Sequence, residues 1–131
     1  MSSNPRVLRG RVVSGEGNFS YWIEKLQEHY ERKTGMRLFP GTLNLELEHP
    51  YSVPLEVMRL EKEEYGGTVS VNIVPCRVFG RAAFILRPDK IEQGQSARPK
   101  TVIEIACDVK LREVYGLEDG DTVEVLLAEG A

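Results

Sequence analysis

A glycine-rich turn between two regular segments is the first feature of the sequence that suits a ligand. Gly15-Glu16-Gly17-Asn18 follows the strand-like residues 6–14 and precedes a helical pattern. Glycines let the backbone approach a ligand closely, and free N–H groups at a helix start can hold phosphate oxygens. The turn lacks the full spacing of a Walker loop or of a dinucleotide-binding loop. These residues alone are consistent with either a phosphate-binding turn or an ordinary strand-to-helix turn.

Two polar side chains on one predicted strand form a second candidate. Thr42 and Asn44 alternate with leucines, so they share one face of the strand and lie about 6.6 Å apart along it. Both offer neutral oxygens, which Mg²⁺ accepts when phosphates and waters complete its octahedral shell. The pattern predicts either a metal site or a solvated polar face.

A carboxylate and a basic segment are the remaining candidates. Glu104 interrupts the apolar run VIEIA, and a buried carboxylate needs a partner such as a ligand N–H or O–H group. On an exposed edge strand, Glu104 would instead meet water. Residues 109–112 (VKLR) carry two cations that suit a phosphate or a base edge. A solvated basic turn that balances neighbouring acids would have the same composition.

The elements that must position these residues are mostly short strands. Strands are expected at 6–14, 42–48, 68–74, 76–86, 102–107 and 122–127, and helices at 20–34, 54–62 and 108–116. The 76–86 segment predicts a hairpin with a type II′ turn at Gly80-Arg81. Asn18 or Ser20 is expected to cap the first helix and Asp108 the last.

The arrangement of these elements favours a mainly β protein with short helices. We expect a small closed or nearly closed β-barrel, with an open α+β sheet as the alternative. A length of 131 residues suits one domain, residues 1–131, with a core of about 6–127. Residues 87–100 are polar and predict a long loop, and long loops in small domains often have a function.

Composition argues against several classes of partner. The net charge is −3 and no dense Lys/Arg run is present, so nucleic acid is not an expected partner. No apolar run approaches the roughly 20 residues of a membrane span, and no signal peptide is evident at the N-terminus. Cys76 and Cys107 form no CxxC pattern and are expected to be buried reduced thiols in a cytoplasmic protein.

The candidates occur in an order that resembles a known family. GRVVSGEGNFSYW, FPGTLNLEL and VIEIACDVKLREVYGLEDGDTVEV are similar to segments of the CTP-dependent riboflavin kinases. The resemblance spans residues 10 to about 125. It implies a cradle-loop β-barrel and transfer of the terminal phosphate of CTP to the 5′-hydroxyl of riboflavin, giving FMN and CDP, with Mg²⁺. A different nucleotide donor, or a flavin- or nucleotide-binding module without catalysis, is the alternative.

The resemblance also implies roles for individual residues. Thr42 and Asn44 would ligate Mg²⁺, while Glu104 and Ser96 would contact the flavin, with Thr101 as an alternative to Ser96. The family has a basic residue near the end of its nucleotide loop, where this chain has Phe19 and Ser20. Lys110, Arg98 or Lys100 could supply that charge. The implied nucleotide-binding residues are Gly15, Glu16, Gly17, Asn18, Phe19, Ser20, Val109, Lys110, Leu111 and Arg112.

Overall fold

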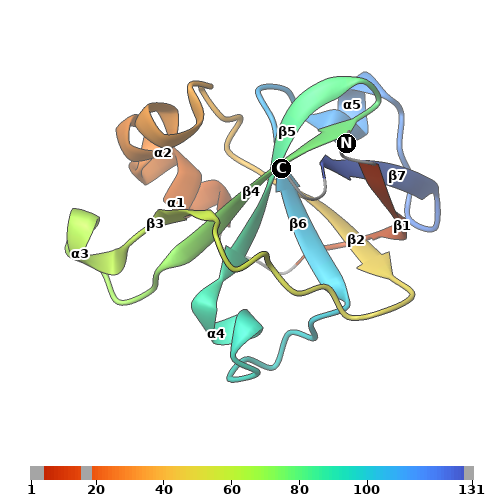
Figure 1. Cartoon of the computed structure of the whole chain (residues 1–131). Helices are drawn as coiled ribbons and strands as arrows, with labels where there is room; N and C mark the ends of the chain where they lie inside the picture. The colour runs from red at the N-terminus through yellow and green to blue at the C-terminus, as the bar shows by residue number, and fades with distance from the viewer. Residues whose placement is uncertain (1–4, 16–18, 129–131) are drawn as a thin grey trace.

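Short strands dominate the computed structural model, which describes residues 5–15 and 19–128 (Figure 1). Within these residues the strands are β1 (Pro5–Val13), β2 (Leu43–Leu47), β3 (Met58–Leu60), β4 (Val71–Val78), β5 (Arg81–Pro88), β6 (Val102–Ala106) and β7 (Thr122–Ala128). The helices are α1 (Phe19–Lys25), α2 (Gln27–Thr34), α3 (Lys62–Tyr65), α4 (Asp89–Glu92) and α5 (Leu111–Val114). None of the helices in this part of the chain has the length and apolar character needed to span a membrane.

The sheet closes on itself as a barrel. Its described strands run in the order β4, β5, β6, β2, β1 and β7, and each neighbouring pair is antiparallel. Pairing of Arg77 with Leu126 and of Val78 with Val125 joins β7 back to β4. The short strand β3 extends the sheet from the other end of β4. The predicted closed β-barrel is therefore confirmed, and the open sheet is excluded.

Alternating leucines fill the barrel interior. Leu43, Leu45 and Leu47 are buried in the main core cluster, as the sequence pattern predicts. Asn44, on the opposite face of the same strand, is also buried and only 7% exposed. Glu46 on the same face is exposed, so this face of β2 is covered around Asn44 and reaches solvent further along the strand.

A second core cluster lies outside the barrel, beneath the first two helices. Figure 1 shows α1 and α2 beside β3 and β4. The helical period places Trp22, Ile23, Leu26 and Tyr30 on one apolar face; the last three are buried there, while Trp22 is 37% exposed. The predicted single helix 20–34 is divided, because Leu26 departs from helical geometry between α1 and α2. Gly35 ends α2 in a left-handed conformation, which glycine adopts without steric cost.

Two local predictions are wrong. No helix spans 54–62, since this segment is extended and pairs with β4 through β3, and the helix α3 begins only at Lys62. The hairpin between β4 and β5 turns at Phe79-Gly80, not at Gly80-Arg81. Both turn residues have positive φ (53° and 74°), which is the pattern of a type I′ turn.

The start of the last helix also differs from expectation. Asp108 was the predicted cap, but α5 begins at Leu111 with Lys110 in the N-cap position, and Lys110 makes no side-chain cap bond. Residues 87–100 are partly regular, because β5 continues through Pro88 and α4 follows. Ser20 lies inside α1, and Asn18, the other proposed cap, lies outside the described residues.

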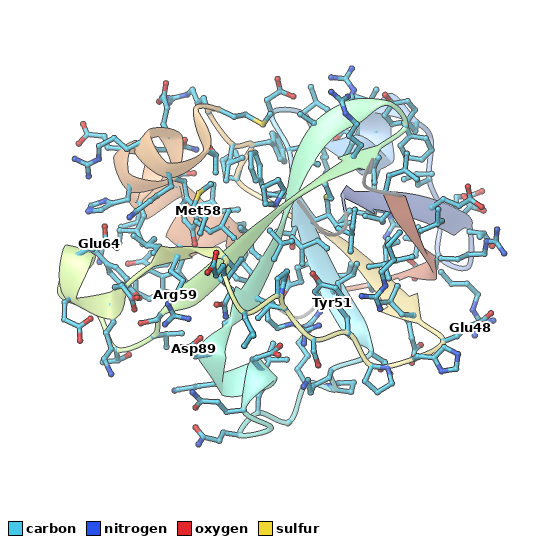
Figure 2. The ribbon with its side chains drawn as sticks, in the orientation of Figure 1. Glu48, Tyr51, Met58, Arg59, Glu64 and Asp89 are labelled. Atoms are coloured by element: carbon cyan, nitrogen blue, oxygen red, sulfur yellow. The ribbon has the colours of Figure 1, made fainter. Side chains whose placement is uncertain are left out.

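A cluster of ion pairs holds α4 against the sheet. Arg59 on β3 bonds both carboxylate oxygens of Asp89, at 2.8 and 3.0 Å, and also pairs with Glu61. Asn72 on β4 donates to Asp89 and accepts from Arg59. Figure 2 shows Arg59 and Asp89 in the region where β3 and α4 approach each other. The hydrogen bond from Arg59 holds the pKa of the Asp89 carboxyl below its usual range.

We expect Asp89→Asn to lower the free energy of unfolding by about 1 kcal/mol at pH 7, because the ion pair is partly exposed. A carboxyl with a depressed pKa stabilises the fold above its unfolded pKa, and that contribution is lost as pH falls through the folded pKa. The difference between variant and wild type should therefore shrink below pH 3.8. Urea titrations at pH 7 and in acid measure this. The exposed Glu24→Gln on α1 is the control, and an equal deficit at both pH values would contradict the prediction.

Candidate functional site

An apolar pocket lies between the first two helices and the outer face of the barrel. Its volume is about 300 Å³, and its walls include Phe19, Trp22 and Tyr65. Ser96, Arg98 and Glu104 are also among its lining residues. Aromatic walls with a few polar groups suit a flat, mostly apolar ligand that carries some hydrogen-bonding atoms.

A second pocket is polar and draws on four separate stretches of the chain. It has a volume of about 410 Å³. Two of its lining residues, Lys110 and Arg112, are cations. An adjoining hollow of about 60 Å³ is lined by Phe39, Gly41, Thr42, Leu43, Ile105 and residues 109–112. The residues that line the larger polar pocket are Val13, Ser14, Gly15, Ser20, Gly41, Thr42, Asn44, Glu104, Lys110 and Arg112.

Glu104 lines both the apolar and the polar pocket. It is only 5% exposed, and the Thr42 hydroxyl donates to its Oε1 at 2.7 Å. Asn44 lies directly opposite Glu104 in the β2–β6 ladder. Burial raises the pKa of the Glu104 carboxyl, while the Thr42 hydrogen bond and the charges of Arg98 and Arg87 oppose this rise. The sequence left open whether Glu104 is buried, and the structure shows that it is.

A cation from the 87–100 segment contacts this carboxylate. The Arg98 guanidinium donates from Nη2 to Oδ1 of Asn44, and its Nε lies 3.8 Å from Oε2 of Glu104. Thr42, Asn44, Glu104 and Arg98 thus form one contact cluster where the two pockets meet. Sequence reasoning considered Arg98 only as a replacement charge, because an arginine in a polar loop usually looks solvated.

The predicted nucleotide loop and the predicted metal residues come together at Gly15. A Cβ atom placed on Gly15 would lie 2.2 Å from Nδ2 of Asn44, which is far inside van der Waals contact. Glycine is therefore needed here for the close approach of β1 to Asn44. The sequence suggested a glycine that makes room for a ligand, and the structure adds this packing reason.

Gly15→Ala is expected to displace the Asn44 side chain and to lower the free energy of unfolding by about 1–3 kcal/mol through overpacking. The clash exists only when Asn44 is present, so the cost should largely vanish on an Asn44→Ala background. Urea unfolding of the two single variants and the double variant measures this coupling. Additive losses in the free energy of unfolding would show that the two side chains do not clash.

Arg112 is held in place at the polar pocket by an acidic turn. Its Nη1 lies 2.9 Å from Oδ1 of Asp119, and the Ser14 hydroxyl donates to the other carboxylate oxygen at 2.8 Å. These hydrogen bonds, that from Ser14 first, hold the pKa of Asp119 below its usual range. Asp119 was not among the site residues predicted from the sequence. Its role in linking β1 to α5 depends on contacts that no local pattern reveals.

Several predicted site residues lie elsewhere or are not described. Phe19 is buried in the outer core and lines the apolar pocket, so its side chain does not join the polar one. Leu111 is buried in the barrel core and reaches only the small hollow. Ser96 lies on the apolar pocket with Arg98. Glu16, Gly17 and Asn18 lie outside the described residues. Sequence reasoning missed the aromatic wall, since Trp22 and Tyr65 resemble ordinary packing residues.

Fold and site together define a closed antiparallel barrel in which a buried carboxylate joins an apolar pocket to a cation-bearing one. A family model named for CTP-dependent riboflavin kinase, and described as a domain of unknown function, DUF120, matches residues 12–127. The chain therefore belongs to the CTP-dependent riboflavin kinase family.

Individual relatives agree with this assignment. A riboflavin kinase of Methanocella arvoryzae is 36% identical over 129 residues, which cover 92% of this chain and 56% of that protein. A riboflavin kinase of Ignicoccus hospitalis is 31% identical over 138 residues, covering 95% of this chain and 73% of that protein. One of Pyrobaculum arsenaticum is 34% identical over 131 residues, with 90% and 59% covered. The chain thus spans little more than half of the first and third of these relatives.

Proposed function

We propose that this chain transfers the terminal phosphate of CTP to the 5′-hydroxyl of riboflavin, giving FMN and CDP. The observation that carries the proposal is the position of Glu104, which lines an apolar pocket on one side and a polar pocket with two cations on the other. A phosphoryl transfer between a flavin and a nucleotide needs two such sites in contact. Family membership and the relatives named riboflavin kinase support the same reaction.

The flavin would occupy the apolar pocket. Trp22, Phe19 and Tyr65 offer aromatic surface to its ring system. Glu104 would accept a hydrogen bond from a ring N–H or a side-chain hydroxyl, which would satisfy a buried carboxylate. Ser96 would contact the flavin near the end of the pocket that also holds Arg98.

The nucleotide would occupy the polar pocket and the adjoining hollow. Lys110 and Arg112 bring positive charge to the phosphates, and Asp119 fixes the position of Arg112. The segment from Gly15 to Ser20 would bring backbone groups to the phosphates. Residues 109–112 line the small hollow, which would receive the cytosine edge. Selection of CTP over other donors is part of this proposal.

The oxygens around Glu104 suit a divalent cation. The Thr42 hydroxyl, the Asn44 amide oxygen and the Glu104 carboxylate are hard oxygen donors. Asn44 and Glu104 already contact a cation, the Arg98 guanidinium. Among residues 5–15 and 19–128, no group of three or more His, Cys, Asp or Glu side chains is placed to hold a metal. We propose that Thr42 and Asn44 hold Mg²⁺ together with substrate phosphates. When bound, Mg²⁺ would neutralise charge on those phosphates.

The residues of the chain would act mainly by alignment and charge. Phosphoryl transfer passes through a loose transition state that needs little proton removal in advance, so no general base is assigned. The cations at the polar pocket would stabilise the charge that spreads over the transferring group. A cytoplasmic location belongs to the same proposal, since Cys76 and Cys107 are both buried free thiols.

The test is FMN formation from riboflavin and Mg²⁺ with CTP, ATP, GTP or UTP in separate reactions. FMN with CTP alone is the expected result. FMN with another donor would keep the kinase and overturn the CTP preference. No FMN with any donor, combined with measurable flavin binding, would favour a binding module without catalysis.

A further inference from the structure

One buried donor at the junction of the two pockets has no hydrogen-bond partner. Nε of Arg98 is buried, and within the described part of the chain nothing accepts a hydrogen bond from it. Its distance of 3.8 Å from Oε2 of Glu104 is too long for a hydrogen bond. Across residues 5–15 and 19–128, two other buried side-chain atoms lack a partner, on Gln27 and Tyr51, but neither residue lines the apolar or the polar pocket.

A donor left unpaired in this way costs free energy, so it indicates an acceptor that binds from outside the chain. Arg98 lines the apolar pocket, and its Nη2 is anchored on Asn44. The anchoring fixes the guanidinium plane while Nε stays free. A fixed guanidinium edge favours a ligand with paired oxygens, such as a phosphate.

A second donor lies on the same segment of the chain. The backbone N–H of Arg98 donates to Oγ of Ser96 at 3.1 Å, so the Ser96 hydroxyl hydrogen remains available to a ligand. Both residues line the apolar pocket, and Arg98 lies beside Glu104, at the place where that pocket meets the polar one. A phosphoryl group transferred from a nucleotide in the polar pocket to a flavin in the apolar pocket would cross this junction. The positive charge of Arg98 also lies next to the Glu104 carboxylate and would shield an incoming phosphate from it.

We propose that Arg98 binds the phosphoryl group on the flavin, so that it distinguishes phosphorylated from unphosphorylated flavin. The proposal rests on the proposed function, because it assumes that the apolar pocket holds a flavin. In this proposal Arg98 contacts the transferred phosphoryl group, so the 87–100 segment contributes a residue to the reaction site.

Calorimetric titration with FMN and with riboflavin, without nucleotide or metal, tests the proposed contact of Arg98 with the phosphate independently of catalytic turnover. Arg98→Gln should weaken FMN binding by about tenfold to about a hundredfold, the range for a lost hydrogen bond to a charged group, and leave riboflavin binding nearly unchanged. Arg98→Lys keeps the charge and should fall between Arg98→Gln and wild type. Arg32→Gln removes an exposed charge from α2, lines neither pocket, and should change neither affinity.

Three results would overturn the proposal, and each points to a different reason for its failure. Unchanged FMN affinity in Arg98→Gln would show that the guanidinium does not touch the phosphate. Equal weakening of FMN and riboflavin, in a variant with an unchanged melting temperature, would show that Arg98 only shapes the pocket. Wild-type protein that binds neither flavin would refute the proposed function itself, and the role of Arg98 with it.

Discussion

Asn44→Ala is expected to lower the rate of FMN formation by about a hundredfold or more, which corresponds to about 2.7 kcal/mol of transition-state stabilisation. The change removes the amide oxygen that holds the Arg98 guanidinium and that is proposed to bind Mg²⁺. Asn44 is buried between Glu104, its partner in the β2–β6 ladder, and Gly15. Loss of its side chain therefore disturbs both pockets. Initial rates of FMN formation with saturating CTP and riboflavin measure the effect.

Asn44→Asp is the matched comparison for this prediction. It keeps an oxygen at the same place and should retain more activity than the alanine variant. Asn44→Ala should still unfold cooperatively, with the free energy of unfolding lowered by about 1–3 kcal/mol, because the Arg98 guanidinium loses its buried acceptor. Full activity in Asn44→Ala would remove this residue from the reacting site.

Arg87→Met is expected to lower the free energy of unfolding by about 3–5 kcal/mol, because it removes one partner from a buried set of polar groups. Arg87 is only 1% exposed. It donates to the backbone carbonyls of Tyr51 at 2.9 Å and Lys100 at 3.1 Å, and it pairs with Glu92 at 3.3 Å. Its guanidinium also lies over the Tyr51 ring, which Figure 2 labels near the middle of the molecule.

The methionine variant would take the Arg87 donor away from the Tyr51 carbonyl and from Glu92. Glu92 would keep the Val53 N–H and the nearby Lys100 ammonium, and the Lys100 carbonyl would keep the Tyr51 N–H. Because natural domains have only about 5–15 kcal/mol of stability, the variant should unfold at much lower urea concentration. Arg32→Met, at an exposed position on α2, is the control and should change stability by less than about 0.5 kcal/mol. A loss below about 1 kcal/mol in Arg87→Met would show that Arg87 does not hold the 87–100 segment in place.

Features that depend on local pattern were predictable from the sequence. Leucines in alternation placed β2 with its apolar face in the barrel, and the helical period placed Ile23, Leu26 and Tyr30 in one core. The closed barrel followed from the number and spacing of short strands. The break at Leu26 was missed. The strand at 58–60 was missed as well, because pairing with β4 overrides local helix preference.

Most residues of the candidate site could be proposed from the sequence, but their contacts with one another could not. Thr42, Asn44, Glu104 and Gly15 were each proposed from weak local signals, and the structure brings them together. The contact of Arg98 with Asn44 joins residues 54 positions apart, so no local pattern contains it. The aromatic wall of the apolar pocket was missed for a related reason. Aromatic residues on a helix pack into a core far more often than they line a ligand pocket.

Transfer of label from CTP carrying ³²P in its terminal phosphate tests the central claim most directly. Purified protein, riboflavin and Mg²⁺ should give labelled FMN and unlabelled CDP, and Asn44→Ala should give almost none. This result would establish both the donor and the acceptor in one reaction. Label that appears only as inorganic phosphate would contradict the proposed transfer from CTP to riboflavin. Formation of unlabelled FMN while CTP persists would contradict CTP as the proposed donor.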